Sequence, residues 1–194
     1  MPETEKSLQE RMTPQERELF EGQRALIGVE TAPVKPHSTI WDNGYGGEPV
    51  TAVTIRQWAD ANEDDNPLWR DAEYAARTSW GGIIAPPLFT LALDDAVWPV
   101  ARLSGQFYQP GLAPQLDRER FPTFRGAMQA NTEWDFHEPV RPGDEITVRG
   151  QLTELFWKQG SRYRLLFLFG EITFRNQRAR LAAKLRTGTV FMFK

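Results

Sequence analysis

Residues 63–89, EDDNPLWRDAEYAARTSWGGIIAPPLF, place an acidic cluster, a turn and a double glycine close together. Asp64 lies between Glu63 and Asp65 and directly before Asn66-Pro67, and its carboxylate could act as a general acid or base. Taken alone, such a cluster is more often the solvated end of a helix, and Asn-Pro is a common turn. Trp69 follows, and its indole donates a hydrogen bond but exchanges no proton at neutral pH. The segment therefore offers one acid–base group without an imidazole beside it.

Histidine and cysteine, the other common sources of a base or nucleophile, are scarce. The chain has two histidines, His37 and His137, and no cysteine. Thiolate catalysis, disulfides and cysteine-ligated metals are therefore excluded, and we predict no metal site. A search for a base would select His137, but we interpret it as a strand residue without a role in proton transfer. We expect His37 to be exposed.

The composition indicates one slightly acidic domain. The 194 residues carry a formal net charge of −3 and have a sequence pI near 5.5. A chain of this length can bury a core but is short for two domains. Its charge gives no general attraction to nucleic acid or anionic lipid. We find no signal-peptide pattern and no segment long enough to span a membrane, and we predict a cytoplasmic location.

The N-terminal segment predicts a helical extension. Residues 3–27 are rich in Glu, Gln, Leu and Arg, and Pro14 divides them into two helices. Thr13 is the expected N-cap of the second helix, with Glu16 as its capping-box partner. The prolines and glycines of residues 31–50 predict an irregular connection to the rest of the chain.

Three further helices are predicted before the sheet, and the shortest of them is capped by Asp71 and carries Tyr74, Ala75 and Ala76. Thr54 and Gln57 form another capping-box pattern and predict a helix over residues 54–63. The run LFTLALDDAVWPVARL is apolar on nearly every side, so we expect other structure to enclose its helix. The proline-rich stretch that follows carries large apolar side chains. Our candidates for a partner-contacting surface are Trp41, Trp98, Phe107 and Tyr108.

The rest of the chain has the two-residue period of β-strands, over residues 124–138, 145–157, 162–175 and 180–193. The residues expected on one face are Ile146, Val148, Gly150 and Leu152 in one strand, and Leu166, Leu168 and Gly170 in the next. A solvated or edge face is expected for the arginines Arg162, Arg164, Arg175, Arg178, Arg180 and Arg186. Helices followed by a long antiparallel sheet predict an α+β domain whose sheet wraps the apolar helix.

Two segments carry a family resemblance. The stretch DDNPLWRDAEYA, with GGIIAPPLF after it, resembles the motif of the MaoC-like hydratases and dehydratases: Asp, any residue, Asn-Pro, any residue, His, any residue, Asp, then an Ile-(Val/Ala)-His-Gly segment. The same family has a Phe-x-x-Pro-Val-x-Pro-Gly-Asp motif at the start of a strand, and the segment FHEPVRPGDEITVRGQLTE is similar to it. The similarity spans roughly residues 40–193 and is nearest to the family's N-terminal, fatty-acid-synthase-like dehydratase half. It implies a hot-dog domain over 40–194, with residues 1–39 as an N-terminal helical extension.

The resemblance also implies a reaction: reversible addition of water to a trans-2-enoyl thioester, usually of coenzyme A, without a metal or bound cofactor. In the family an Asp and a His share the acid–base work, and a glycine N–H stabilises the enolate oxygen. Asp64 matches the aspartate, Asn66 the motif's Asn, and Trp69 the histidine. Pro86 lies near the glycine position and has no N–H. The substrate-binding residues that the resemblance implies are Asn66, Trp69, Gly82, Ala85 and Pro86.

These matches predict a degenerate site. Losing one general acid or base lowers a rate by ~10²–10⁴-fold, and losing an oxyanion donor by a similar factor, so alone the chain should not be a competent hydratase. Hot-dog domains of this family pair by extending their sheets. We therefore predict a subunit of an enoyl-CoA hydratase or 3-hydroxyacyl-thioester dehydratase that shapes the acyl-CoA pocket, for a bulky lipid such as a steroid or polyketide chain. A related partner subunit, in a heterodimer or heterotetramer, supplies the intact Asp and His.

Two alternatives stay open. The chain could form a non-catalytic homodimer that binds acyl-CoA, or it could be a self-sufficient hydratase that uses Asp64 with a displaced base such as His137. In each case a subset of the strand arginines could bind coenzyme A phosphates.

Overall fold

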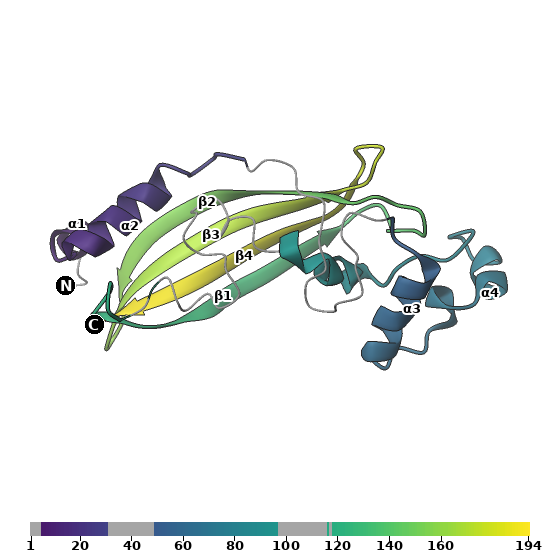
Figure 1. Cartoon of the computed structure of the whole chain (residues 1–194), viewed down its shortest axis with the longest axis horizontal. Helices are drawn as coiled ribbons and strands as arrows, with labels where there is room; N and C mark the ends of the chain where they lie inside the picture. Colours follow the sequence, from purple (N-terminus) through teal and green to yellow (C-terminus); the bar gives the residue numbers. More distant parts are fainter. Residues whose placement is uncertain (1–4, 31–48, 97–115, 117) are drawn as a thin grey trace.

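The computed structural model describes residues 5–30, 49–96, 116 and 118–194. Helices precede strands along the chain, as Figure 1 shows. The helical elements are α1 (Glu5–Glu10), α2 (Pro14–Arg24), α3 (Ala52–Ala61), the 3₁₀ turn η1 (Pro67–Trp69), α4 (Ala72–Ala76) and the 3₁₀ segment η2 (Pro87–Ala96). The strands are β1 (Phe124–Phe136), β2 (Thr147–Gln159), β3 (Arg164–Arg175) and β4 (Leu181–Phe193).

The four strands form one antiparallel sheet in the order β1-β4-β3-β2. Their bounds differ from the predicted ones by no more than two residues at either end. Burial alternates along β2 and β3, and the predicted inner-face residues of both strands are buried. The predicted α+β order, helices followed by a long antiparallel sheet, is therefore confirmed.

The helices lie at the two ends of the sheet, in two groups. Figure 1 shows α1 and α2 at the end of the sheet where the chain terminates, and α3 and α4 beyond the opposite end. The first group buries Leu8, Met12, Leu19 and Phe20 against the sheet, and we call this the N-terminal cluster. At the other end, α3, η1 and η2 pack against loops and strands in the motif cluster, whose buried residues are Val50, Ile55, Ala59, Trp69, Ile84, Ala85, Phe89, Leu93, Val140, Ile146, Val148, Ile172, Phe174, Ala182, Ala183 and Leu185.

The predicted division of the N-terminal segment is confirmed. α1 ends at Glu10 and α2 begins at Pro14. The Thr13 N–H donates to Glu16 Oε2 at 3.0 Å, and the Glu16 N–H donates to Thr13 Oγ1 at 3.2 Å, which completes the capping box. Glu16 is also fully buried, which is unusual for a capping-box glutamate on a surface helix.

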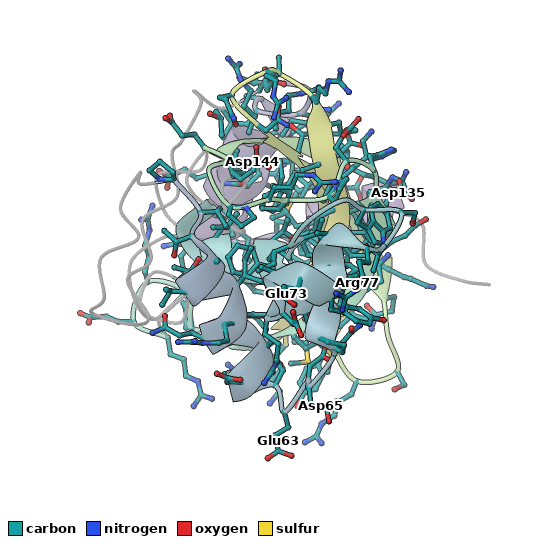
Figure 2. All side chains as sticks on the ribbon, turned by 90° about the vertical axis from the view of Figure 1, so that its right-hand side faces the viewer. Glu63, Asp65, Glu73, Arg77, Asp135 and Asp144 are labelled. Atoms are coloured by element: carbon teal, nitrogen blue, oxygen red, sulfur yellow. The ribbon has the colours of Figure 1, made fainter. Side chains whose placement is uncertain are left out.

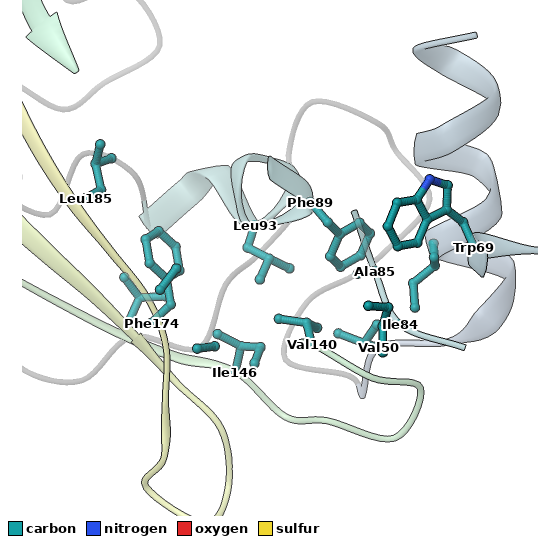
Figure 3. Close-up of a cluster of buried hydrophobic side chains, with 14 of the residues drawn as sticks. Val50, Trp69, Ile84, Ala85, Phe89, Leu93, Val140, Ile146, Phe174 and Leu185 are labelled. Atoms are coloured by element: carbon teal, nitrogen blue, oxygen red, sulfur yellow. The ribbon is translucent and has the colours of Figure 1, made fainter. Parts of the chain in front are cut away.

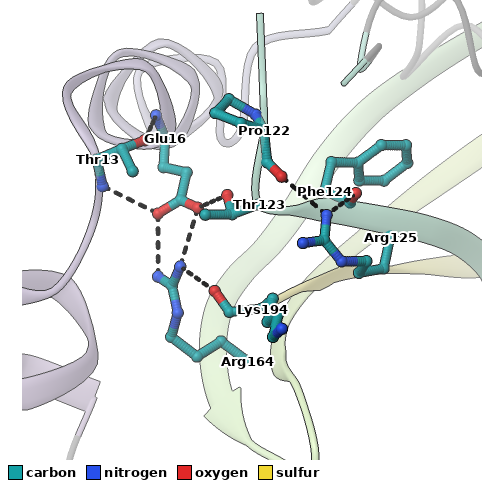
Figure 4. Close-up of polar contacts among 8 residues, drawn as sticks. All are labelled: Thr13, Glu16, Pro122, Thr123, Phe124, Arg125, Arg164 and Lys194. Carbon is teal, nitrogen blue, oxygen red and sulfur yellow. Dashed lines mark hydrogen bonds and ion pairs between the residues drawn. The ribbon is translucent and has the colours of Figure 1, made fainter. Parts of the chain in front are cut away.

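Arg164 explains this burial and corrects one prediction (Figure 4). Its guanidinium donates to both carboxylate oxygens of Glu16, at 3.0 and 2.9 Å, and to the carbonyl of Lys194 at 3.2 Å. The Thr123 hydroxyl also donates to Glu16. Arg164 is buried, so its prediction on a solvated face is wrong. The strand period places it on the inner face, where a carboxylate from α2 pairs with its charge.

Two helix predictions also need correction. The helix predicted over residues 54–63 is α3, which begins at Ala52. Its N-cap is Thr51, not Thr54, and Thr54 is the reciprocal partner in the capping box. The described part of the predicted apolar helix lies in a 3₁₀ segment with a kink at Leu93 (φ −91°, ψ 38°), and residues 97–103 of the prediction lie outside the described residues. The hydroxyl of Thr90 donates to the Pro87 carbonyl, a local bond that competes with regular helix.

Several predictions fall outside the described residues. These are the exposure of His37, the partner surface of Trp41, Trp98, Phe107 and Tyr108, and the domain boundary after residue 39. Within the described part of the chain, none of the helices has the length and hydropathy needed to cross a membrane.

Candidate active site

The turn after α3 holds Asp64 in place. Asp64 donates its backbone N–H to the Ala59 carbonyl at 2.9 Å, which closes the helix end. Its carboxylate oxygen Oδ1 accepts the Asn66 N–H at 3.1 Å, and the Asn66 side chain in turn accepts the Leu68 N–H at 3.0 Å. Asx turns of this kind fix a short backbone path. Figure 2 shows the neighbours Glu63 and Asp65 pointing away from the molecule.

Trp69 completes the turn by donating to the same carboxylate. The distance from Trp69 Nε1 to Asp64 Oδ2 is 2.8 Å. The indole is 8% exposed and lies in the motif cluster with Ile84, Ala85 and Phe89, as Figure 3 shows. Both carboxylate oxygens of Asp64 therefore accept an N–H from within the turn. One of these donors is the residue at the motif's histidine position.

Arg70 also stabilises the turn, through a hydrogen bond and an ion pair. Its guanidinium donates to the backbone carbonyl of Asp64 and forms an ion pair with Asp60, 3.0 Å away, on the last turn of α3. Arg70 was not among the site residues predicted from the sequence. Its position directly after Trp69, within reach of the acidic residues of the motif, is the signal that could have identified it.

The double glycine leads into the second half of the site. Gly81 has a left-handed backbone (φ 66°), and its N–H donates to the Thr78 carbonyl at 3.0 Å, so a glycine suits this turn. A Cβ on Gly82 would lie 4.0 Å from Nη1 of Arg141. The Arg141 guanidinium also donates to the Trp80 carbonyl at 2.9 Å, which connects the glycine segment to the loop after β1.

Backbone donors near the motif's glycine position are already used or missing. The Ala85 N–H donates to the Val140 carbonyl at 2.8 Å. Pro86 has no N–H, and its carbonyl accepts the Phe89 N–H at 2.8 Å. Neither residue can therefore offer a hydrogen bond to an enolate oxygen. The Val140 carbonyl was not predictable from the sequence, because any residue type provides a carbonyl.

The structure thus brings some of the predicted site residues together. Trp69 and Ala85 share the motif cluster, while Asp64 and Asn66 form the half-exposed turn beside it. His137 is exposed at the end of β1, where its backbone N–H donates to the Ala182 carbonyl at 2.9 Å. Among the described residues, no group of three or more His, Asp or Glu side chains is arranged to hold a metal ion.

The bonds around Asp64 lead to a stability prediction. Asp64→Ala should lower the free energy of unfolding by about 1–3 kcal/mol, because the indole N–H and the Asn66 N–H both lose their acceptor. Asp65→Ala, at the exposed neighbour, is the matched control and should change it by no more than about 0.5 kcal/mol. Urea denaturation followed by tryptophan fluorescence measures both. Equal losses in the two variants would contradict the bonding role of Asp64.

Fold and site together define an α+β hot-dog domain with a motif of the hydratase type. The model of the FAS1-like, dehydratase domain region matches residues 41–185. A UPF0336 protein of Thermobifida fusca is 31% identical over 108 residues, which cover 55% of this chain and 61% of that protein. The chain therefore spans less than two thirds of this relative.

Two Mycobacterium tuberculosis proteins add to the comparison. The 3-oxo-4,17-pregnadiene-20-carboxyl-CoA hydratase alpha subunit is 26% identical over 135 residues, which cover 69% of this chain and 40% of that protein. The ChsH1-ChsH2 complex has a chain with a TM-score of 0.64 at 16% identity, covering 90% of this chain and 95% of that one. This chain belongs to the MaoC-like hot-dog family, in its FAS1-like dehydratase region, and the predicted family and fold are confirmed.

Proposed function

We propose that the chain is a subunit of an enoyl-CoA hydratase or 3-hydroxyacyl-thioester dehydratase that shapes the acyl-CoA pocket. A related partner subunit supplies the intact Asp and His pair. The observation that carries this proposal is the 2.8 Å bond from the Trp69 indole to Asp64, at the two positions that match the family's acid–base pair. Coenzyme A enters as part of the substrate, and the reaction requires no other cofactor.

The chemistry of water addition argues against catalysis by this chain alone. One group must take a proton from water and another must deliver a proton to the α-carbon of the thioester. An indole N–H donates a hydrogen bond but cannot accept a proton from water. Asp64 could still act as a base, but both of its oxygens already accept hydrogen bonds from the turn. A carboxylate held in this way is suited to positioning Trp69.

The second catalytic requirement, stabilisation of the enolate oxygen, also points to the partner. Ala85 has donated its N–H to Val140, and Pro86 has none. A missing oxyanion donor lowers a rate by about 10²–10³-fold. The rate loss from the missing oxyanion donor multiplies the rate loss from the missing imidazole. Restoring the imidazole alone would therefore leave the rate low, because the oxyanion donor would still be missing.

The open edge of the sheet supports a partner that continues it. β1 is the edge strand next to β4, and seven consecutive residues, Ala127 to Glu133, are exposed on both of its faces. Residues near Gly28 bridge the opposite edge at β2, where the Gly28 N–H donates to the Leu152 carbonyl at 2.8 Å. A long exposed edge with few charges is a template for pairing with another strand. Two relatives are named as an alpha subunit and as a two-protein complex, which fits a partnered chain.

The decisive experiment compares the isolated chain with its complex. The purified chain should hydrate crotonyl-CoA and a bulky enoyl-CoA no faster than buffer, and Trp69→His should not restore turnover because the oxyanion donor is still missing. A hydratase-like protein co-expressed with it should form a stable complex whose activity exceeds that of the partner alone. Brisk turnover by the isolated chain would favour the self-sufficient alternative, with Asp64 and a base such as His137. Acyl-CoA binding without an active complex would favour the non-catalytic homodimer.

A further inference from the structure

Arg141 extends from the candidate site along the glycine segment. It directly follows Val140, whose carbonyl accepts the Ala85 N–H at 2.8 Å. The Arg141 guanidinium donates to the Trp80 carbonyl at 2.9 Å. It also lies near Gly82, where a Cβ would be 4.0 Å from Nη1. A cationic group therefore lies directly beside the positions that match the family's oxyanion segment.

Asp144 brings a second arginine close to the first. Its Oδ2 accepts the Arg141 N–H at 2.8 Å, and its Oδ1 lies 4.0 Å from Nη2 of Arg178, in the β3–β4 turn. The side chain of Asp144 is 5% exposed, whereas that of Arg178 is 67% exposed. The carboxylate is therefore shielded from solvent, and the Arg178 guanidinium is accessible to an anion.

The backbone of the β3–β4 turn fixes the position of Arg178. Oδ1 of Asn176 accepts the N–H groups of Arg178 and Arg180, at 3.0 and 3.1 Å. Ala179 has a left-handed backbone (φ 59°), which is uncommon for a residue with a side chain, and its carbonyl accepts Nη1 of Arg175 at 3.0 Å. Strained residues that their surroundings hold in this way are frequent in ligand-binding turns.

The charges in this region are mixed. Between β1 and β2 and around the β3–β4 turn there are four arginines and three carboxylates, with a net charge of +1: Arg141, Arg175, Arg178, Arg180, Glu138, Asp144 and Glu145. On α4, Arg77 and Glu73 form a pair at 4.0 Å. An acidic protein surface would meet the carboxylates as well as the arginines, whereas a phosphate group can contact a single guanidinium. The charges therefore favour a small phosphorylated ligand.

Trp80 adds an aromatic surface beside Arg141. Its indole is 46% exposed, and the residue directly precedes the double glycine. A nucleotide base can stack on an exposed indole, and a neighbouring guanidinium can bind the phosphates of the same nucleotide. The aromatic surface and the two arginines together match a ligand that carries both a base and phosphates.

We infer that Trp80, Arg141 and Arg178 bind the 3′-phospho-ADP part of coenzyme A. Trp80 stacks against the adenine, and Arg178 binds the 3′-phosphate. Arg141, which is nearer to the candidate site, binds the diphosphate, and the pantetheine arm passes Gly82 toward Ala85. This inference rests on the proposed function and names coenzyme A as the carrier of the acyl chain. An acyl carrier protein has the same pantetheine arm but no adenine and no 3′-phosphate.

Binding of coenzyme A to the isolated chain, measured by isothermal titration calorimetry, tests the site. Arg178→Ala should weaken binding by about 10-fold or more, and Trp80→Ala by at least about 5-fold. Arg162→Ala is the matched control, because it removes an exposed arginine from the β2–β3 turn at the opposite end of the sheet, and it should change binding by less than about 2-fold. Equal losses for Arg178→Ala and Arg162→Ala, or no binding to the wild-type chain, overturn the inference.

Removing the 3′-phosphate from the ligand gives an independent test. 3′-Dephospho-coenzyme A should bind the wild-type chain about 10-fold more weakly than coenzyme A, and Arg178→Ala should bind the two about equally. A wild-type chain that does not distinguish the two ligands overturns the inference.

The complex with a partner subunit separates this inference from the proposed function. An active complex whose KM for enoyl-CoA is unchanged by Arg178→Ala would overturn the nucleotide site and leave the proposed function intact. An inactive complex whose Arg178 still distinguishes coenzyme A from its 3′-dephospho form would overturn the proposed function and keep the site.

Discussion

Replacing Arg164 with alanine is expected to lower the free energy of unfolding by about 3–5 kcal/mol. The substitution leaves the carboxylate of Glu16, which is 0% exposed, without its guanidinium partner. It also removes the bond to the Lys194 carbonyl and the contact with Trp157, whose ring lies 5.4 Å beneath the guanidinium carbon. Urea denaturation followed by circular dichroism measures the loss. The large effect follows from an unpaired buried charge.

Two further variants separate this explanation from a general loss of an arginine. Arg180→Ala breaks the Arg180–Glu138 pair, which has a similar distance of 3.0 Å but side chains that are 62% and 46% exposed, and should cost no more than about 1 kcal/mol. The double variant Glu16→Gln with Arg164→Met removes both charges and should recover much of the loss. A loss for Arg164→Ala no larger than that for Arg180→Ala would contradict the buried-pair account.

The same pair shows where the sequence was informative and where it was not. The two-residue period assigned Leu166 and Leu168 to the inner face, and the same period assigns Arg164 to it. Residue type argued for solvent, because arginine is seldom buried without a partner. The partner, Glu16, is 148 residues away and was already explained as a capping-box residue. A short-range pattern can predict the cap but not the second, long-range role of the same carboxylate.

The candidate site also has features that the sequence predicted and features that it did not. The motif predicted which residues occupy the positions of the acid–base pair, and the Asn66-Pro67 turn set their register. The bond between Trp69 and Asp64 depends on how η1 directs the indole back over the turn, which residue types alone do not specify. The use of the Ala85 N–H by Val140 was also unpredictable, because it joins backbone groups of two distant loops. The structure therefore shows hydrogen-bond partners for the Asp64 carboxylate and the Ala85 N–H that the residue types did not indicate.

Trp69→Ala is the second substitution with a large expected effect, again about 3–5 kcal/mol of unfolding free energy. The indole is 8% exposed, and its removal leaves a cavity among Ile84, Ala85 and Phe89. Trp80→Ala is the matched control, because its indole is 46% exposed in the neighbouring segment, and it should change stability by no more than about 0.5 kcal/mol. Urea denaturation monitored by circular dichroism compares the two, since both variants lose a fluorophore.

Trp69→Phe distinguishes the two contributions of the indole. Phenylalanine keeps most of the buried ring but has no N–H for Asp64, which is half exposed and can bind water instead, so its loss should be about 1–2 kcal/mol. If packing dominates in this way, Trp69 is a core residue whose position Asp64 fixes. If Trp69→Ala and Trp80→Ala lose equal amounts, Trp69 is not part of the core. In the structure, the position that matches the catalytic histidine is a buried packing position, so a base introduced there would be desolvated and would still lack an oxyanion donor at Ala85 or Pro86.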